Sequence, residues 1–185
     1  MKNSLLVGLS SAVIVVQLAV PLSMIIKREV TLKEGIEFRF KTAPVDPFDA
    51  FRGRYVALRV DVNQVPTQET LSYQKNVYAA LMVDEQGYAK IMSVSSQKPK
   101  NVPYVMATVG YQSGGLVNVH LPFDRYYMNE KSAPRAESLY REHNFNRQGQ
   151  PADAYITVRV KDGFSVIDGL YLGGKKIEEL IKIKT

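Results

Sequence analysis

The sequence predicts a mainly β fold, a β-sandwich or partly open barrel of about eight strands with one inserted amphipathic helix, behind an N-terminal transmembrane helix. Three observations predict it. A long uncharged apolar run stands near the N-terminus. Most of the remaining chain alternates apolar and polar residues with period two, which is typical of half-buried strands. Glycine-containing turn signals separate these runs at short intervals. We therefore divide the chain into an anchor, residues 1–28, and a β-rich domain, residues 29–185.

The anchor is predicted from the run between Asn3 and Ile26, which contains no charged residue and is followed at once by Lys27 and Arg28. A helix of this length, rising about 1.5 Å per residue, spans the roughly 30 Å hydrocarbon core of a bilayer. A helix is expected because no water satisfies free backbone groups there. A cleaved signal peptide normally has a shorter apolar region, about 7–15 residues, before a small-x-small site. The run therefore favours a retained single-pass anchor over a cleaved peptide or a buried soluble helix.

The orientation of the anchor has two conflicting signals. The flank from Lys27 to Lys41 carries five basic and three acidic residues, and by the positive-inside rule this favours a cytoplasmic C-terminal domain. The start of the chain, however, is similar to an export signal. We expect the second signal to decide. The expected location is the inner (cytoplasmic) membrane, single-pass, with the C-terminal domain extracytoplasmic on the periplasmic side.

The composition excludes several chemistries. Cysteine is absent, which excludes disulfides, a thiol nucleophile and any zinc site built from thiolates. The only histidines are His120 and His143, so no metal site or other cofactor is expected. The net charge of +6 comes from scattered charges rather than from a basic stripe. This pattern indicates a mixed solvated surface and no nucleic-acid partner. An anionic membrane surface and an acidic glycan are the alternative partners for the excess positive charge.

The domain is expected to begin with two strands and a loop. In "GIEFRFK", Ile36, Phe38 and Phe40 lie on one face and the charged residues lie on the other. The stretch "TAPVDPFDAFRG" is predicted as a loop because its two prolines cannot donate ladder hydrogen bonds. The next run, "RYVALRVDV", alternates again. Its apolar face is formed by Val56, Leu58, Val60 and Val62.

Three hairpins are predicted next. They join "NVYAALMVD" to "YAKIMSVS" around "EQG", "PYVMATVG" to "GLVNVHLP" around "YQSG", and "DAYITVRVKDG" to "FSVIDGLYLGG" around Asp162-Gly163. A further tight turn is expected at Gly173-Gly174, before "KKIEELIKI". On the strand "VNVHLP", His120 is expected to be exposed.

One segment breaks the strand pattern. In "SAPRAESLYREHNF" the apolar residues stand at i, i+3, i+4 and i+7, the spacing of one face of a helix. Ser132 is a suitable N-cap and Pro134 fits the first turn. The helix is predicted from about Ala133 to Asn144, with His143 in its apolar stripe.

Three stretches resemble one protein family. "KTAPVDPFDAFRGRYVALRV" resembles the segment that names the GDYXXLXY family of bacterial membrane-anchored proteins, "FDRYYMNE" is similar to its Arg-Tyr-aromatic-x-x-Glu segment, and "GLYLGGKKIEE" is similar to its closing hairpin. Gly53, Tyr55 and Leu58 match the name motif. Arg54 and Val60 stand where the motif has Asp and Tyr. The resemblance implies an architecture and a place in the bacterial cell envelope, but no activity.

Two clusters are candidate recognition surfaces. The loop before the motif carries Asp46 and Asp49, a carboxylate pair that could serve acid/base chemistry or a hard cation. We expect instead an Asx-type turn with ion pairs to Arg52 and Arg54.

In the second cluster, Arg125 could bind an anion, and Tyr126 and Tyr127 could stack on a sugar or peptide. The alternative is an edge strand with the charges paired and one tyrosine packed. The cluster contains Arg125, Tyr126, Tyr127 and Glu130. Tyr55, in the motif after the loop, is a further candidate for the recognition surface.

These observations favour a non-enzymatic binding or accessory module of the cell envelope whose partner is another membrane or envelope protein. A signal-peptidase-like or other membrane-surface hydrolase is one alternative, because Ser23-Met24 and then Gly53 occur in a comparable order. The acid after Gly53 and a lysine base on a strand are absent, however, and no Gly-x-Ser-x-Gly elbow occurs. An envelope glycan binder is the other alternative, suggested by the 11 tyrosines.

Overall fold

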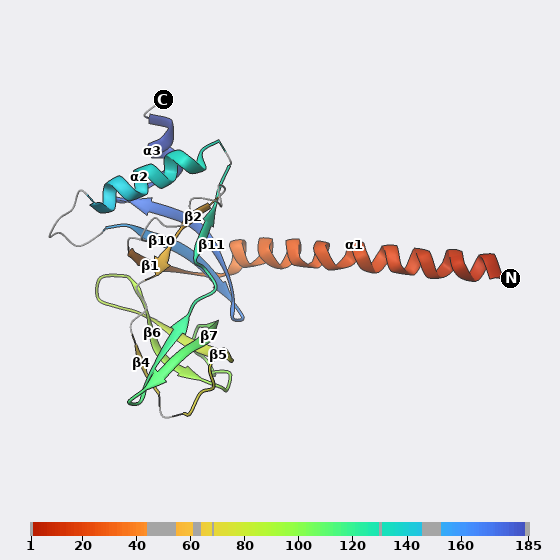
Figure 1. Cartoon of the computed structure of the whole chain (residues 1–185), viewed down its shortest axis with the longest axis horizontal. Coiled ribbons are helices and arrows are strands. Elements are labelled where there is room, and N and C mark those ends of the chain that lie inside the picture. Colours follow the sequence, from red (N-terminus) through yellow and green to blue (C-terminus); the bar gives the residue numbers. More distant parts are fainter. Residues whose placement is uncertain are drawn as a thin grey trace.

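The computed structural model describes residues 2–43, 55–60, 64–67, 69–129, 131–145 and 153–183. It confirms a mainly β domain with a long N-terminal apolar helix, which projects alone from the side of the domain (Figure 1). The helices are α1 (Lys2–Glu34), α2 (Ala133–Phe145) and α3 (Ile177–Ile183). The longer strands are β1 (Ile36–Ala43), β5 (Asn76–Val83), β6 (Ala89–Ser95), β7 (Tyr104–Ser113), β8 (Leu116–His120), β10 (Tyr155–Lys161) and β11 (Phe164–Leu172). The short strands are β2 (Tyr55–Ala57), β3 (Arg59–Val60), β4 (Val65–Pro66), β9 (Arg125–Tyr127) and β12 (Lys175–Lys176).

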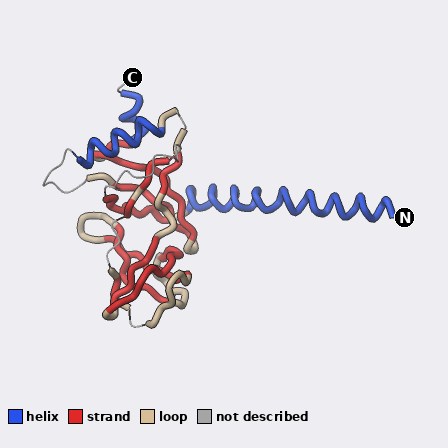
Figure 2. The backbone as a smooth tube through the Cα atoms, in the orientation of Figure 1, coloured by secondary structure: helices blue, strands red, loops and turns tan. Residues whose placement is uncertain are grey.

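The strands form two five-stranded sheets and one small ladder. The first sheet has the order β12-β11-β10-β1-β3 and the second the order β4-β8-β7-β5-β6, while β2 pairs with β9. The second sheet curls until its edge strands β4 and β6 approach each other, so it is nearly a barrel. The two sheets lie one beside the other along the domain, and α2 and α3 cover the far end of the first (Figures 1 and 2).

A single apolar core runs through both sheets. Most of its fully buried side chains come from the inward faces of the long strands, because alternation sends every second residue inward, and α3 adds Ile177. The largest are Ile156, Leu170, Ile177, Val77, Val105, Val109, Val117 and Val158. The rings of Phe40 and Phe123 meet between the sheets with centroids 4.9 Å apart. The core therefore makes the two sheets one packing unit.

The tip of the β10–β11 hairpin links the two sheets. Asp162 and Gly163 both have positive φ, as a two-residue hairpin turn requires. Gly163 forms a parallel bridge to Val105, and its carbonyl accepts a hydrogen bond from Met106 N at 3.1 Å. A Cβ built on Gly163 would lie 2.5 Å from Cε2 of Tyr104. The turn predicted from the sequence is thus also an inter-sheet contact.

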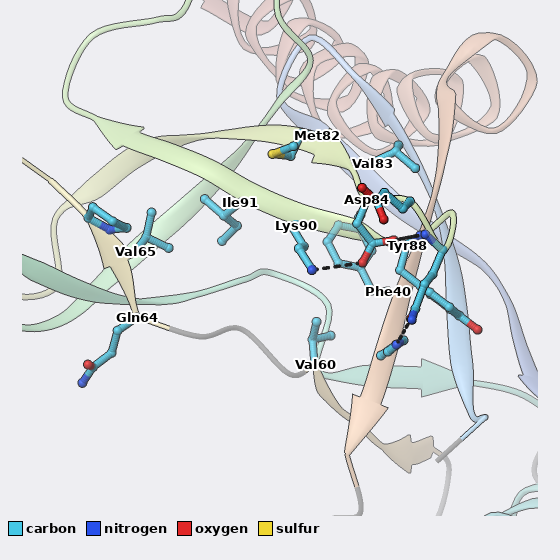
Figure 3. Close-up of a pocket in the computed structure, with 15 residues that line it drawn as sticks. Phe40, Val60, Gln64, Val65, Met82, Val83, Asp84, Tyr88, Lys90 and Ile91 are labelled. Carbon is cyan, nitrogen blue, oxygen red and sulfur yellow. Dashed lines mark hydrogen bonds and ion pairs between the residues drawn. The ribbon is translucent and has the colours of Figure 1, made fainter. Parts of the chain in front are cut away.

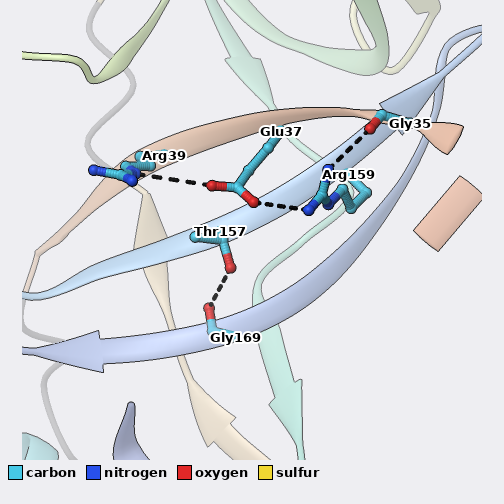
Figure 4. A network of polar contacts seen from close by, with 6 residues as sticks. All are labelled: Gly35, Glu37, Arg39, Thr157, Arg159 and Gly169. Atoms are coloured by element: carbon cyan, nitrogen blue, oxygen red, sulfur yellow. Dashed lines mark hydrogen bonds and ion pairs between the residues drawn. The ribbon is translucent and has the colours of Figure 1, made fainter. Parts of the chain in front are cut away.

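The base of α1 is held against the first sheet by a polar network (Figure 4). Arg159 on β10 donates to the carbonyl of Gly35 at 3.2 Å and pairs with Glu37 on β1 at 3.0 Å. The buried Thr31 hydroxyl donates to the Lys27 carbonyl at 2.8 Å. A Cβ on Gly35 would lie 2.4 Å from the Thr31 carbonyl oxygen, so the chain leaves the helix with no room for a side chain. The junction is therefore closely packed.

The helix itself is long and apolar enough to span a bilayer, by the length and composition of residues 11–34. Its apolar side chains lie on all sides and are exposed, among them Val15, Leu18 and Met24. A helix that is apolar all round is stable only when something apolar surrounds it. α1 continues to Glu34, six residues beyond the anchor boundary of residue 28, which stays a prediction.

The sequence predictions differ from the structure at three places. The motif run divides at Leu58, whose N–H donates to the Asp124 carbonyl, so β2 and β3 join different sheets. Ile36 is exposed, unlike Phe38 and Phe40, because it lies at the end of β1 beyond the core. The segment after Gly173-Gly174 forms α3, where only a turn was predicted. The three hairpins, and α2 to within one residue, are confirmed.

We predict that Gly163→Ala destabilises the protein more than Gly87→Ala does. Both glycines have positive φ, which costs an L-residue about 1–2 kcal/mol. At Gly163 an added Cβ would also overlap the Tyr104 ring, whereas nothing lies within 4 Å of a Cβ on Gly87. Overpacking adds about 1–3 kcal/mol. Thermal unfolding of the full chain in mild detergent, followed by circular dichroism, measures the difference. Equal losses would mean that the hairpin tip does not link the sheets.

Candidate functional site

The structure pairs the motif strand with the second predicted cluster. β2 carries the motif residue Tyr55 and pairs antiparallel with β9, so that Tyr55 stands opposite Tyr127 and Val56 opposite Tyr126. These segments lie 70 residues apart in the chain and are joined by backbone hydrogen bonds. The helix α2 packs against β2, and β11 lies beside β9. The segments that resemble the family are therefore neighbours in space.

Tyr126 and Glu178 form the centre of this junction. The Tyr126 ring is 8% exposed, and its hydroxyl donates to the Glu178 carboxylate on α3. Burial first, and then the Glu178 carboxylate, raise the pKa of Tyr126 well above that of a free tyrosine. The second oxygen of Glu178 is buried without a hydrogen-bond partner among the described residues. A neutral tyrosine thus joins β9 to the segment "GLYLGGKKIEE".

The other predicted site residues have different positions. Tyr127 is 65% exposed, and Arg125 lies 3.6 Å from its neighbour Asp124. Of the two tyrosines, Tyr127 is therefore the exposed one and Tyr126 the buried one. The remaining candidates lie outside the described residues. They are Asp46, Asp49, Arg52, Arg54 and Glu130.

A cleft of about 650 Å³ opens where three edge strands meet (Figure 3). β3 is an edge of the first sheet, and β4 and β6 are the two edges of the second. We call this opening the edge cleft. Its apolar wall includes Phe40, Val60, Val65, Met82 and Ile91. Met82 is 45% exposed and Val83 is 52% exposed, which is high for large apolar residues in a packed hairpin.

The rim of the edge cleft is polar and ordered by the β5–β6 turn. Asp84 accepts hydrogen bonds from the backbone N–H groups of Tyr88 at 2.9 Å and Gln86 at 3.0 Å, and Lys90 lies 3.2 Å away. The Tyr88 N–H is the main reason that the pKa of Asp84 lies below its usual value, and Lys90 adds to it. Lys41 donates to Gln86 at 2.7 Å. The rim therefore presents fixed charges of both signs beside an apolar wall.

A row of tyrosines continues from the rim across the outer face of the first sheet. Tyr155 stacks on Tyr171 with ring centroids 5.0 Å apart and meets the edge of Tyr88 at 5.9 Å. Lys41 lies 4.5 Å from the Tyr88 centroid, and Arg39 lies 5.9 Å from that of Tyr155. Burial raises the pKa of Tyr155. The rings pack mainly on one another and on cations, so the row stabilises the outer face of the sheet.

No local pattern in the sequence predicts the edge cleft. Its walls come from β1, β3, β4, β5 and β6, which the chain brings together only on folding. The "DEQG" turn was recognised as a hairpin, but only the sheet order shows that β6 is an edge beside β4. Alternation of apolar and polar residues does not indicate which strands form the edges of a sheet.

The histidines and Ser23 are the other side chains considered for catalysis. His143 on α2 bonds through Nε2 to Asp153, and His120 is exposed, as predicted. Ser23 lies on α1, and its hydroxyl donates to the Val20 carbonyl at 2.6 Å. Within the described part of the chain, no group of three or more His, Asp or Glu residues could hold a metal ion.

Comparison with known proteins gives one match. The model of the family described as GDYXXLXY protein matches residues 17–170, which is most of the chain and includes the motif strand, β9 and most of β11. No curated protein and no solved structure shows a significant match.

We predict that Tyr126→Phe lowers the free energy of unfolding by about 1.5–3 kcal/mol, the usual contribution of a hydrogen bond to a charged group. Tyr73→Phe is the control because Tyr73 is 70% exposed. It should change stability by less than about 0.5 kcal/mol. Thermal unfolding of the full chain in detergent measures both. A loss in Tyr126→Phe no larger than in Tyr73→Phe would contradict a structural role for the hydroxyl.

We also predict a pH dependence. Because the pKa of Tyr126 is raised in the folded state, its contribution to stability is complete below the unfolded-state pKa of about 10 and is lost as pH rises further. Subtracting the stability profile of Tyr126→Phe from that of the wild type isolates this residue, since Tyr155 is present in both. The difference should shrink above about pH 10. A difference that grows with pH would contradict the buried neutral tyrosine.

Proposed function

The chain belongs to the GDYXXLXY family, and from its architecture we propose that it is a membrane-anchored, non-enzymatic binding module of the cell envelope. Its partner is an extended segment of another membrane or envelope protein. The module presents the β-rich domain on the extracytoplasmic side of the inner membrane, and the edge cleft is its recognition site.

One observation carries this proposal: three strand edges border one open cleft. In the described part of the chain, β6 pairs only with β5, and β3 pairs only with β1. An exposed edge has free N–H and C=O groups that bind an added strand, and pockets beside it select alternate side chains. The edge cleft supplies both. Natural edges are usually blocked by charge, proline or a covering element. Pro66 on β4 and Lys90 on β6 are blocking features of this kind, but the exposed Met82 and the half-buried Ile91 leave an apolar wall beside them.

One end of the β4–β6 seam is already closed, which defines where a partner strand would lie. The Glu69 carboxylate accepts hydrogen bonds from Ser95 at 2.6 Å and from the Ser96 N–H at 2.9 Å. These bonds, the Ser95 hydroxyl first, lower the pKa of Glu69. The seam is open at the other end, beside Ala89 and Ile91. A partner strand would enter there, and the Asp84–Lys90 pair would set its register through charge.

We predict an extracytoplasmic C-terminus. Alkaline phosphatase fused after Thr185 should be active, because that enzyme needs disulfides that form only outside the cytoplasm. A green fluorescent protein fused at the same position is the complementary reporter. An inactive phosphatase fusion would place the domain in the cytoplasm and remove envelope proteins as partners.

We predict that Met82→Arg weakens partner capture. A benzophenone-bearing residue in place of Val83 is irradiated in native membranes, and the products are identified by mass spectrometry. An arginine in place of Met82 brings a hydrated charge to the apolar wall where the partner's apolar side chains would bind, so the yield of the main protein adduct should fall at least about tenfold, equivalent to about 1.4 kcal/mol.

Met92→Arg is the matched control. Met92 lies on the same hairpin and is 49% exposed, close to the 45% of Met82, but it does not line the edge cleft. It should leave the adduct unchanged. Equal losses in the two variants would reject the cleft as the site, and the absence of any protein adduct at Val83 would reject the binding module itself.

A further inference from the structure

The structure shows how deep the domain lies relative to a bilayer that contains α1. Lys27 is the first charged residue after the apolar run, so it marks the end of the hydrocarbon core. Its ammonium lies 4.4 Å from the ring centroid of Phe164, the first residue of β11. The headgroup layer of one leaflet is about 5–8 Å thick. The tip of the β10–β11 hairpin is therefore at the level of the lipid headgroups, whichever side the domain faces.

A hollow of about 510 Å³ opens at the same level, beside α1. Its lining combines a cation, hydrogen-bonding side chains and an apolar wall. Lys27 supplies the charge, Asn76 and the exposed His120 supply polar groups, and the wall is formed by Leu121, Pro122 and Phe164. Small-molecule sites have this composition and volume, about 300–1,000 Å³.

We propose that this hollow, between the base of α1 and the two sheets, binds the headgroup of an anionic phospholipid. The phosphate lies on the Lys27 ammonium, within reach of the Asn76 amide and the His120 ring. The start of the lipid's apolar part lies against Phe164 and Leu121. A lipid is the ligand that this position selects, because headgroups are present at this depth at very high local concentration and a lipid in the same leaflet needs no further entry path.

The charges around the hollow favour an anion. Asp162 is the acidic residue in the described lining, and it is also near Lys98. The Tyr104 hydroxyl first, and Asp162 after it, raise the pKa of Lys98, so Asp162 faces a permanent cation. Lys161 and Glu34 pair with each other at the base of α1. Among the described residues, Lys27 contacts the Phe164 ring rather than a carboxylate. Its charge is therefore available to a phosphate.

The first test measures which lipid stays bound. The full chain is reconstituted into nanodiscs of equimolar phosphatidylglycerol and phosphatidylcholine, transferred to mild detergent and analysed by native mass spectrometry. The wild type should retain phosphatidylglycerol in preference. Lys27→Gln should lower that retention about fivefold, because one interfacial cation contributes about 1 kcal/mol. Equal retention of the two lipids by the wild type would overturn the proposal.

Arg28→Gln is the matched control. Arg28 lies at the same depth on the next position of α1 but does not line the hollow. Detergent removes the bulk membrane surface, so Arg28→Gln should retain lipid as the wild type does. An equal loss in both variants would show a general interfacial charge effect and reject the site. Inorganic phosphate added in detergent should not displace the lipid, and displacement would assign the hollow to free phosphate.

The second test measures depth directly and does not depend on lipid retention. The sequence contains no tryptophan, so Phe164→Trp creates a single fluorophore that keeps the aromatic contact with Lys27. In vesicles, a lipid with a nitroxide on its headgroup should quench it strongly. Tyr88→Trp, at the edge cleft, is the control and should be quenched little. Equal quenching of the two would mean that the hairpin tip is not at the headgroups, and the proposal would fail.

Discussion

The direction in which α1 leaves the first sheet is fixed by the close approach at Gly35, and the rest of the molecule's geometry depends on it. The carbonyl of Gly35 follows the last turn of the helix, where backbone oxygens lack helical partners and a cation is favourable. Arg159 supplies that cation and holds Glu37 with its other nitrogen, so one side chain joins the helix end to β1 and β10. Because a Cβ at Gly35 would overlap the Thr31 carbonyl oxygen, the junction cannot open to accept a larger residue without shifting the helix.

Because the junction is closely packed, the direction of α1 determines which face of the domain lies beside the helix. The face beside α1 carries the β10–β11 tip and the hollow with Lys27, so this is the face that would meet the headgroups under the proposed membrane anchoring. The strands β4 and β6 and the β5–β6 turn lie on the side of the domain away from α1 (Figure 1). The edge cleft therefore lies on the side of the domain away from α1. Under the proposed function, lipid and protein would contact opposite faces of one domain, and neither would block the other.

The sequence predicted what local rules determine and missed what only the sheet order determines. Alternation predicts Phe38 and Phe40 in the core, and the glycines predict the turns at Gly87 and Asp162-Gly163, where the structure has positive φ. Both signals act over a few residues. The division of the motif run at Leu58 depends on Asp124, far along the chain, and cannot be read locally. Tyr126, a predicted recognition residue, is buried against Glu178, and Glu178 belongs to a helix that alternation did not reveal.

The two departures from the family motif, at positions 54 and 60, have different structural consequences. The pairing of β2 with β9 uses backbone groups, so the register Tyr55–Tyr127 does not require an acid at position 54. Leu58, which matches the motif, is buried and donates its N–H across to Asp124. Val60, which replaces the motif tyrosine, lies in β3 and lines the edge cleft. A tyrosine side chain there would extend into the space beside Phe40 and Ile91. The smaller valine leaves that space open, so the substitution at position 60 changes the shape of the proposed recognition site, whereas the motif leucine maintains the fold around it.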